Sequence, residues 1–287
     1  MHLAFSSMNT PNDPPPAELA LALEQRGFES LWYGEHSHIP TARTTPYPPG
    51  GEMPDPYKQM MDPYLSLMTA ANATSRLRLG TGIALLMERD IFSQAKTIAT
   101  LDHLSGGRVM IGTGVGWNQE EYENVNPHPF NKRYAVLRET VEATRKLWCE
   151  DQAEYHGTYI DFEPVWSAPK PTQPSGPPIF LGAMGPLGRK HAAAWADGWY
   201  PVDVAMGDVA KTLEHFREEV RQAGRDPAEV ETNIQIMDTG NLDKLKHYRD
   251  LGIQRATIGV SMDMWDKPEE VMPMIDRYAH IIPTLGA

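Results

Sequence analysis

The chain has 287 residues, and Asp and Glu outnumber Lys and Arg by 38 to 26, which gives a formal net charge of −12. This acidic balance disfavours nucleic acid and anionic lipid surfaces as partners. The single cysteine, Cys149, excludes a disulfide within the chain. No apolar run reaches the ~20 residues needed to cross a bilayer, and no signal-peptide pattern opens the sequence. We therefore expect a cytoplasmic protein.

Short apolar runs alternate with amphipathic helical patterns from the first residues onward. In the first half we expect strands at residues 3–5, 30–33, 77–81 and 109–111, each followed by a helical pattern. Asp62 and Pro63 suit the start of the second helix, because Asp caps a helix and Pro fits its first position. A proline-rich loop of roughly residues 35–61 precedes that helix.

The second half repeats the alternation after an interruption. Residues 155–166 indicate an inserted hairpin, and residues 169–178 form a proline-rich connector. The expected strands that follow are 179–181, 198–200, 232–237 and 256–258, and their helices are 187–196, 208–223, 242–251 and 268–282.

Eight strand–helix cycles in a chain of this length predict an α/β fold, a closed (β/α)₈ TIM barrel formed by one domain over residues 1–287. The long loop follows its second strand and the hairpin precedes its fifth. An open, doubly wound sheet is the main alternative. In a barrel, the catalytic side chains come from the loops at the carboxyl ends of the strands, which directs attention to those loops.

The loop after the second strand carries Glu35, His36 and His38. A neutral imidazole suits proton transfer near neutral pH, so His36 is the candidate acid–base residue and Glu35 a candidate partner. Glu35 can equally be a buried structural acceptor, and we expect His38 to be solvated or structural. The His36-x-His38 pair also resembles a metal site of barrel hydrolases, but no later predicted strand ends in a histidine, so we assign no metal ligands.

Glycines follow the third, fourth and fifth strands, at residues 80–82, 112–116 and 182–185. The fourth-strand spacing is G-x-G-x-G, which is weak as a dinucleotide fingerprint but suits a bare backbone ledge beneath a flat ring. The fifth-strand turn leads directly into a helix, whose free amides favour a phosphate. Each turn can also be a plain, tight barrel corner.

Together these loops resemble the bacterial-luciferase-like monooxygenase superfamily, and most of all its branch that uses the deazaflavin coenzyme F420. The resemblance extends from Leu3 to about Tyr278. Its most specific stretches are residues 77–82 (LRLGTG), 101–108 (LDHLSGGR) and 112–117 (GTGVGW), followed by Glu120 and Glu121. Residues 31–36 (LWYGEH) and 197–199 (DGW) support it.

The resemblance implies a role for each loop. It implies a non-proline cis peptide at Gly82–Ile83 behind the cofactor ring, with His36 near the ring carbon that exchanges hydride and Glu35 as a neighbouring acid. The implied cofactor-binding residues are Thr81, Gly82, Ile83, Val115, Gly116, Trp117, Gly182, Ala183, Met184 and Gly185, of which the last four take the phosphate. Two departures, Pro40 for a tryptophan and Trp117 for a glutamate, argue against the sugar-phosphate substrate of some members.

We therefore expect an oxidoreductase that transfers hydride between an organic small molecule and coenzyme F420. The loop of residues 41–56 should roof the pocket, and nearby aromatic and methionine side chains indicate a partly apolar substrate. The alternative is that this segment is a disordered surface loop.

The family resemblance implies a homodimer. The rival functions are an FMN-dependent monooxygenase on the same fold, a metal-dependent barrel hydrolase using His36 and His38, and a non-catalytic cofactor-binding protein. The sequence specifies neither the substrate nor the direction of hydride transfer.

Overall fold

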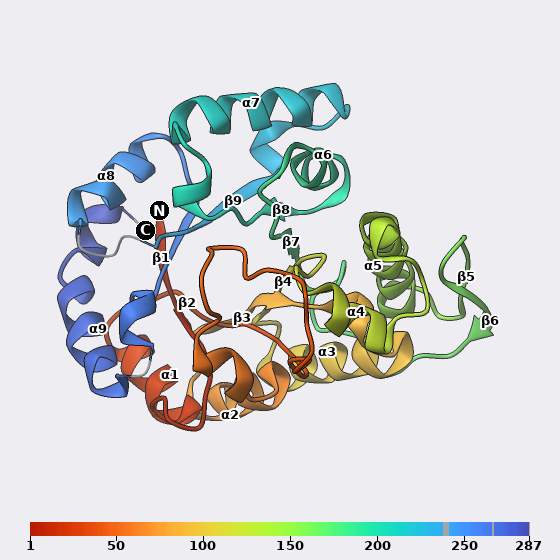
Figure 1. The fold of residues 1–287 in the computed structure, drawn as a ribbon, viewed down its shortest axis with the longest axis horizontal. Helices are drawn as coiled ribbons and strands as arrows, with labels where there is room; N and C mark the ends of the chain where they lie inside the picture. Colours follow the sequence, from red (N-terminus) through yellow and green to blue (C-terminus); the bar gives the residue numbers. More distant parts are fainter. Residues whose placement is uncertain (238–240, 266, 287) are drawn as a thin grey trace.

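In the computed structural model, which describes residues 1–237, 241–265 and 267–286, eight parallel strands close into a barrel. Their order around the barrel is β1-β10-β9-β8-β7-β4-β3-β2 (Figure 1). Their bounds are β1 His2–Ser7, β2 Ser30–Tyr33, β3 Arg78–Ala84, β4 Val109–Thr113, β7 Ile179–Leu181, β8 Gly198–Trp199, β9 Glu231–Gln235 and β10 Arg255–Ile258. The predicted TIM barrel is confirmed, and every predicted strand overlaps an observed one.

Helices surround the sheet, as Figure 1 shows. Their bounds are α1 Pro16–Gln25, α2 Pro63–Ala73, α3 Ile91–Ser105, α4 Gln119–Val125, α5 Arg133–Cys149, α6 Pro186–Trp195, α7 Val209–Gln222, α8 Leu242–Asp250 and α9 Val271–Ala279. Asp62 caps α2 as predicted, since its carboxylate accepts the backbone amides of Tyr64 and Leu65. The short helix α4 was not predicted. The expected helix at 268–282 is shorter, because 3₁₀ turns flank α9 at both ends.

The barrel interior is filled by side chains from β1, β2, β4, β7 and the end of β8. Ala4, Trp32, Met110, Phe180 and Tyr200 form this inner cluster, and the Trp32 ring contacts Phe180 and Tyr200 edge-on. Gly80 makes room for Trp32, because a methyl group there would lie 2.3 Å from Cδ2 of the indole. The barrel is therefore a packed core, and ligands have access only to its ends.

Two segments depart from the strand–helix alternation. The inserted hairpin is confirmed as β5 (Ala153–His156) paired antiparallel with β6 (Asp161–Val165), at the periphery of the molecule (Figure 1). The long loop between β2 and α2 contains one 3₁₀ turn, Asp55–Gln59. No helix in the described ranges is both long enough and apolar enough to cross a membrane.

Candidate active site at the carboxyl end of the barrel

The three glycine turns converge on one side chain, that of Ile83. A methyl group at Gly114 would lie 2.3 Å from Cδ1 of Ile83, and one at Gly182 would lie 2.9 Å from its Cγ2. The end of β3 and the turns after β4 and β7 therefore meet at one rim, as the sequence predicted, although Gly80 and Gly82 lie within β3 and not after it. The peptide bond between Gly82 and Ile83 is cis, as the family resemblance implied. One detail differs from expectation: Ile83 covers Gly114, so this glycine does not form part of the bare ledge expected after the fourth strand.

His36 lies on the same rim and is held by a carboxylate that the sequence analysis did not assign. Its Nδ1 is 2.6 Å from Oε2 of Glu121, and the two side chains are 8% and 1% exposed. His36 follows β2, whereas Glu121 is in helix α4, which follows β4. The pair thus joins loops that are 85 residues apart in sequence. An ionised carboxylate accepts hydrogen bonds only, so with Glu121 in that form Nδ1 of His36 carries the proton in this contact.

Aromatic rings enclose the His36 imidazole. Tyr57 contacts it edge-on at 5.4 Å between ring centroids, and Trp117 does so at 5.8 Å. Tyr47 contacts both of those rings, and Trp265 contacts Tyr57 from the far side. Burial raises the pKa of the Tyr57 hydroxyl above its usual range. The His36 imidazole is therefore enclosed largely by aromatic rings.

Glu35 is next to His36 in sequence, but other groups engage its carboxylate. Oε2 accepts the backbone amide of Leu85 at 2.9 Å, and Oε1 accepts Nε of Arg89 at 2.5 Å. Arg89 also pairs with Asp62 at the start of α2. These contacts favour the structural role that the sequence left open for Glu35. Its catalytic role stays a prediction.

A second carboxyl group missed by the sequence analysis is Glu88. Both of its oxygens are enclosed, and neither has a hydrogen-bond partner among the described residues. Burial, together with the negative charges of Glu121 and Glu35, raises the pKa of Glu88 to about 9. A protonated, neutral acid thus lies beside the rim, close to Gly116, where a methyl group would be 3.1 Å from its Oε1.

The turn before α6 is the most open part of the predicted cofactor-binding set. Gly185 is the N-cap residue, no side chain caps the helix, and no atom lies within 4 Å of a methyl group placed on it. The first amides of α6 therefore remain available to an anion. Arg189, one turn further on, is committed to Glu219 at 2.6 Å.

The other predicted cofactor-binding residues are packed more tightly. The Thr81 hydroxyl donates to the carbonyl of Gly112 inside the barrel. Val115 and Ala183 are buried, and the Ala183 carbonyl accepts the indole N–H of Trp199. Met184 accepts the Val202 amide at its sulfur. These four residues shape the rim, while Gly116 and Trp117 are half-buried and Gly185 is exposed.

The long loop after β2 is fastened across the mouth. Oε1 of Glu120, in α4, accepts the amide and hydroxyl of Thr44 and the amide of Thr45. Hydrogen bonds from Thr45 and Thr44 lower the pKa of Glu120 to about 2. Arg43 packs over the Trp117 ring. These contacts attach the segment to α4 and favour its expected role as a roof over the pocket.

Nothing in the described ranges assembles a metal site. No group of three or more His, Cys, Asp or Glu side chains is arranged to hold an ion there. The two ring nitrogens of His38 contact the Ser37 hydroxyl and the Asn124 amide, in the structural role expected for it.

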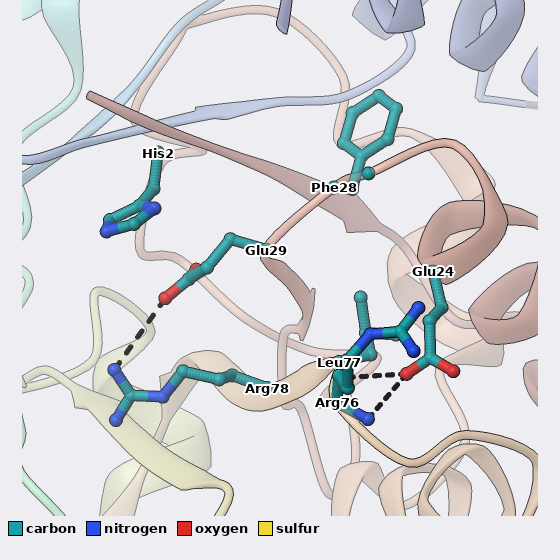
Figure 2. Close-up of a pocket in the computed structure, with 8 residues that line it drawn as sticks. His2, Glu24, Phe28, Glu29, Arg76, Leu77 and Arg78 are labelled. Atoms are coloured by element: carbon teal, nitrogen blue, oxygen red, sulfur yellow. Dashed lines mark hydrogen bonds and ion pairs between the residues drawn. The ribbon is translucent and has the colours of Figure 1, made fainter. Parts of the chain in front are cut away.

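A pocket of about 430 Å³ lies at the opposite end of the barrel (Figure 2). Figure 2 shows Glu29 paired with Arg78, and Glu24 bonded at the segment of residues 76–77. Its lining comes from the end of α1 and the amino ends of β1, β2 and β3, the face of a barrel that serves stability and not catalysis. Because its acids are committed to these bonds, this pocket is not the candidate active site.

Comparison with known proteins agrees with this geometry. The family model described as luciferase-like monooxygenase matches residues 12–237. An uncharacterised protein of Mycobacterium tuberculosis is 38% identical over 268 residues, covering 91% of this chain and 92% of its own. The F420-dependent hydroxymycolic acid dehydrogenase of that organism is 29% identical, covering 78% of this chain and 59% of its own. A solved F420-dependent secondary alcohol dehydrogenase, in complex with an F420-acetone adduct, superposes with a TM-score of 0.76 at 21% identity, covering 99% of this chain and 98% of its own. The chain belongs to the luciferase-like monooxygenase family.

Proposed function

We propose that this protein is an F420-dependent oxidoreductase that transfers hydride between coenzyme F420 and a neutral, partly apolar organic substrate. One observation carries the proposal: a buried His36, oriented by Glu121, lies on the rim where three glycine turns meet. Relatives named as F420-dependent dehydrogenases support the choice of cofactor.

The residues on this rim fit a flat ring with an anionic arm. The uncapped amino end of α6 at Gly185 offers backbone amides to a phosphate without steric obstruction. The cis segment at Ile83 and the backbone of residues 115–117 would hold the ring. The acidic tail of the deazaflavin needs a cation near the mouth of the barrel, but two cations there are already engaged, since Lys58 pairs with Asp55 and Arg89 with Glu35. Arg43, on the face of Trp117, is the better candidate for that contact.

The chain's own contribution is proton transfer, orientation and exclusion of water. When bound, the deazaflavin would supply the carbon that accepts or donates hydride. With Nδ1 protonated toward Glu121, His36 presents Nε2 as the base that takes the hydroxyl proton of an alcohol, or as the acid that returns it in the reverse direction. Tyr57 and Trp117 keep bulk water from the imidazole.

The test is a pair of binding titrations, one with F420 and one with FMN, followed by absorbance measurements of F420 reduction with a panel of secondary alcohols. We expect saturable F420 binding, weaker FMN binding and reduction by at least one alcohol. Tight binding of FMN alone would assign the protein to the flavin-dependent monooxygenases. F420 binding without hydride exchange in either direction would indicate a non-catalytic carrier, and stoichiometric zinc without affinity for either cofactor would indicate a hydrolase.

A further inference from the structure

The structure contains an acidic partner for His36 that belongs to a different strand–helix unit. Helix α4 follows β4, and its third residue, Glu121, reaches the imidazole of His36 in the loop after β2. The Nδ1–Oε2 distance of 2.6 Å is short for an N–H···O contact, as expected when one partner is ionised. Both side chains are almost fully enclosed, so water does not compete for this contact.

This contact would determine which imidazole nitrogen can do chemistry. An isolated neutral imidazole distributes its proton between Nδ1 and Nε2, whereas a carboxylate at Nδ1 holds the proton there. Nε2 then keeps its lone pair. The rings of Tyr57 and Trp117 restrict rotation of the imidazole, so the direction of Nε2 is fixed as well.

We propose that Glu121 is a positioning residue of the active site, which fixes the Nδ1–H tautomer of His36 and favours proton uptake at Nε2. The proposal deepens the proposed function, because it assigns a task to a residue that does not itself touch the reacting atoms. Glu121 acts through His36, as the buried carboxylate of a catalytic triad acts through its histidine.

The titratable groups around the pair are either engaged by other partners or neutral. These groups are Glu88, Glu35 and Tyr57, and Arg89 is the cation near Glu35. Arg89 is engaged by Glu35 and Asp62. The pKa of Glu88 is raised to about 9, partly by the charge of Glu121, so Glu88 is neutral at pH 7. Glu121 and His36 are therefore left to interact with each other, and a proton bound by the imidazole has the Glu121 carboxyl group as its partner.

The remaining oxygen of Glu121 supports a functional role. Oε1 is buried and has no hydrogen-bond partner among the described residues. A carboxylate kept only for structure would be expected to satisfy both oxygens, as Glu35 does with Arg89 and Leu85. The single strong contact that Glu121 makes is the one with His36.

The experiment reads the His36 ring directly in the cofactor-free protein. Selective ¹⁵N-histidine labelling and NMR would give the tautomer and titration of His36, assigned by its loss in His36→Gln. Glu121→Gln is compared with Glu123→Gln, an exposed position of the same helix, as the matched control.

We expect the Nδ1–H tautomer in the wild-type protein and in Glu123→Gln. In Glu121→Gln we expect a growing Nε2–H population, and a midpoint of the ring titration about one pH unit lower, because the imidazolium loses its counter-charge. An unchanged tautomer and midpoint in Glu121→Gln would overturn the proposal. If that variant does not fold, the wild-type tautomer decides, since a proton on Nε2 contradicts the proposal.

The same samples separate this inference from the proposed function. Failure of F420 binding in the wild-type protein would reject the cofactor assignment and leave the NMR result standing. If F420 binds, Glu121→Gln should bind it normally but lose at least about tenfold in kcat, with a pH–rate profile displaced in the same direction as the ring titration. Normal kcat and an unmoved profile would reject the positioning role alone.

Discussion

The two ends of the barrel both bury charged side chains, but they pair them differently. At the amino end, Arg255 makes a two-point contact with Glu29, at 2.8 Å for each bond, and a third contact with Glu231. At the carboxyl end, Glu88 and one oxygen of Glu121 are enclosed without a hydrogen-bond partner among the described residues. At the amino end the buried charges pair with one another, whereas at the carboxyl end these carboxyl oxygens lack a hydrogen-bond partner within the described ranges.

The difference separates stability from function. A buried charge whose bonds are all made within the protein has nothing left to offer a ligand, so the pocket in Figure 2 belongs to the framework. An enclosed acid without a partner lowers stability and is tolerated where chemistry needs it. Glu88 and Glu121, beside His36, are acids of this second kind, which supports placing the active site there.

The largest expected effect is the loss of activity in His36→Ala. Without an acid–base group at this position, kcat should fall by about 10²- to 10⁴-fold while F420 still binds, as measured by steady-state kinetics and a binding titration. His38→Ala is the matched control and should keep nearly full activity, because the ring nitrogens of His38 are engaged by Ser37 and Asn124. Full turnover by His36→Ala would refute its role in proton transfer.

A substitution at the amino end of the barrel should lower the stability of the protein without impairing catalysis. Arg255→Ala leaves Glu29 without its main partner, which should lower the free energy of unfolding by about 3–5 kcal/mol. Denaturant unfolding measures this loss, and kcat of the folded fraction should stay unchanged. A variant with normal stability, or one with specifically impaired catalysis, would break the division between the two ends.

Because the carboxyl group of Glu88 is buried without a hydrogen-bond partner in the described part of the chain, the free energy of unfolding should fall at alkaline pH. The pKa of Glu88 is raised from 4.5 to about 9 in the folded protein. Its contribution to stability is therefore complete below pH 4.5 and is lost as the pH rises toward 9, by up to about 1.4 kcal/mol per pH unit. Glu88→Gln should remove this slope and raise Tm at pH 8 with little change at pH 5. Parallel Tm-against-pH curves for the two proteins would contradict this expectation.

The smallest effect should come from the loop that covers the mouth. Glu120→Ala removes the acceptor of three hydrogen bonds from Thr44 and Thr45. We expect KM for the organic substrate to rise by about three- to tenfold with little change in kcat, because the loop would close less often over a site that is otherwise intact. Steady-state kinetics of Glu120→Ala, with Glu123→Gln as the control, would measure the rise in KM. A fall in kcat with unchanged KM would contradict this expectation.

The sequence predicted the fold well because barrel strands are buried on both faces and appear as short apolar runs. It missed α4, whose seven residues are mostly polar and too few to show helical periodicity. Leu104 fits the apolar stripe of α3 but is 62% exposed, since packing and not spacing decides burial.

The candidate site, too, could be predicted only in part from the sequence. His36 could be found from its place at a strand end, whereas the contact of Glu121 with it depends on how two loops fold against each other. Glu88 has no spacing signal at all.

The central claim is that the rim at His36, Ile83 and Gly185 holds the cofactor, and an F420 titration of Gly185→Asp tests it most directly. Asp at this N-cap position should stabilise α6 and meets no steric obstruction, so the variant will fold. Its charge opposes a phosphate at the helix end, and we predict at least about tenfold weaker F420 binding than in the wild-type protein or in Gly185→Asn. Equal F420 affinity in all three proteins would contradict the placement of the cofactor on this rim.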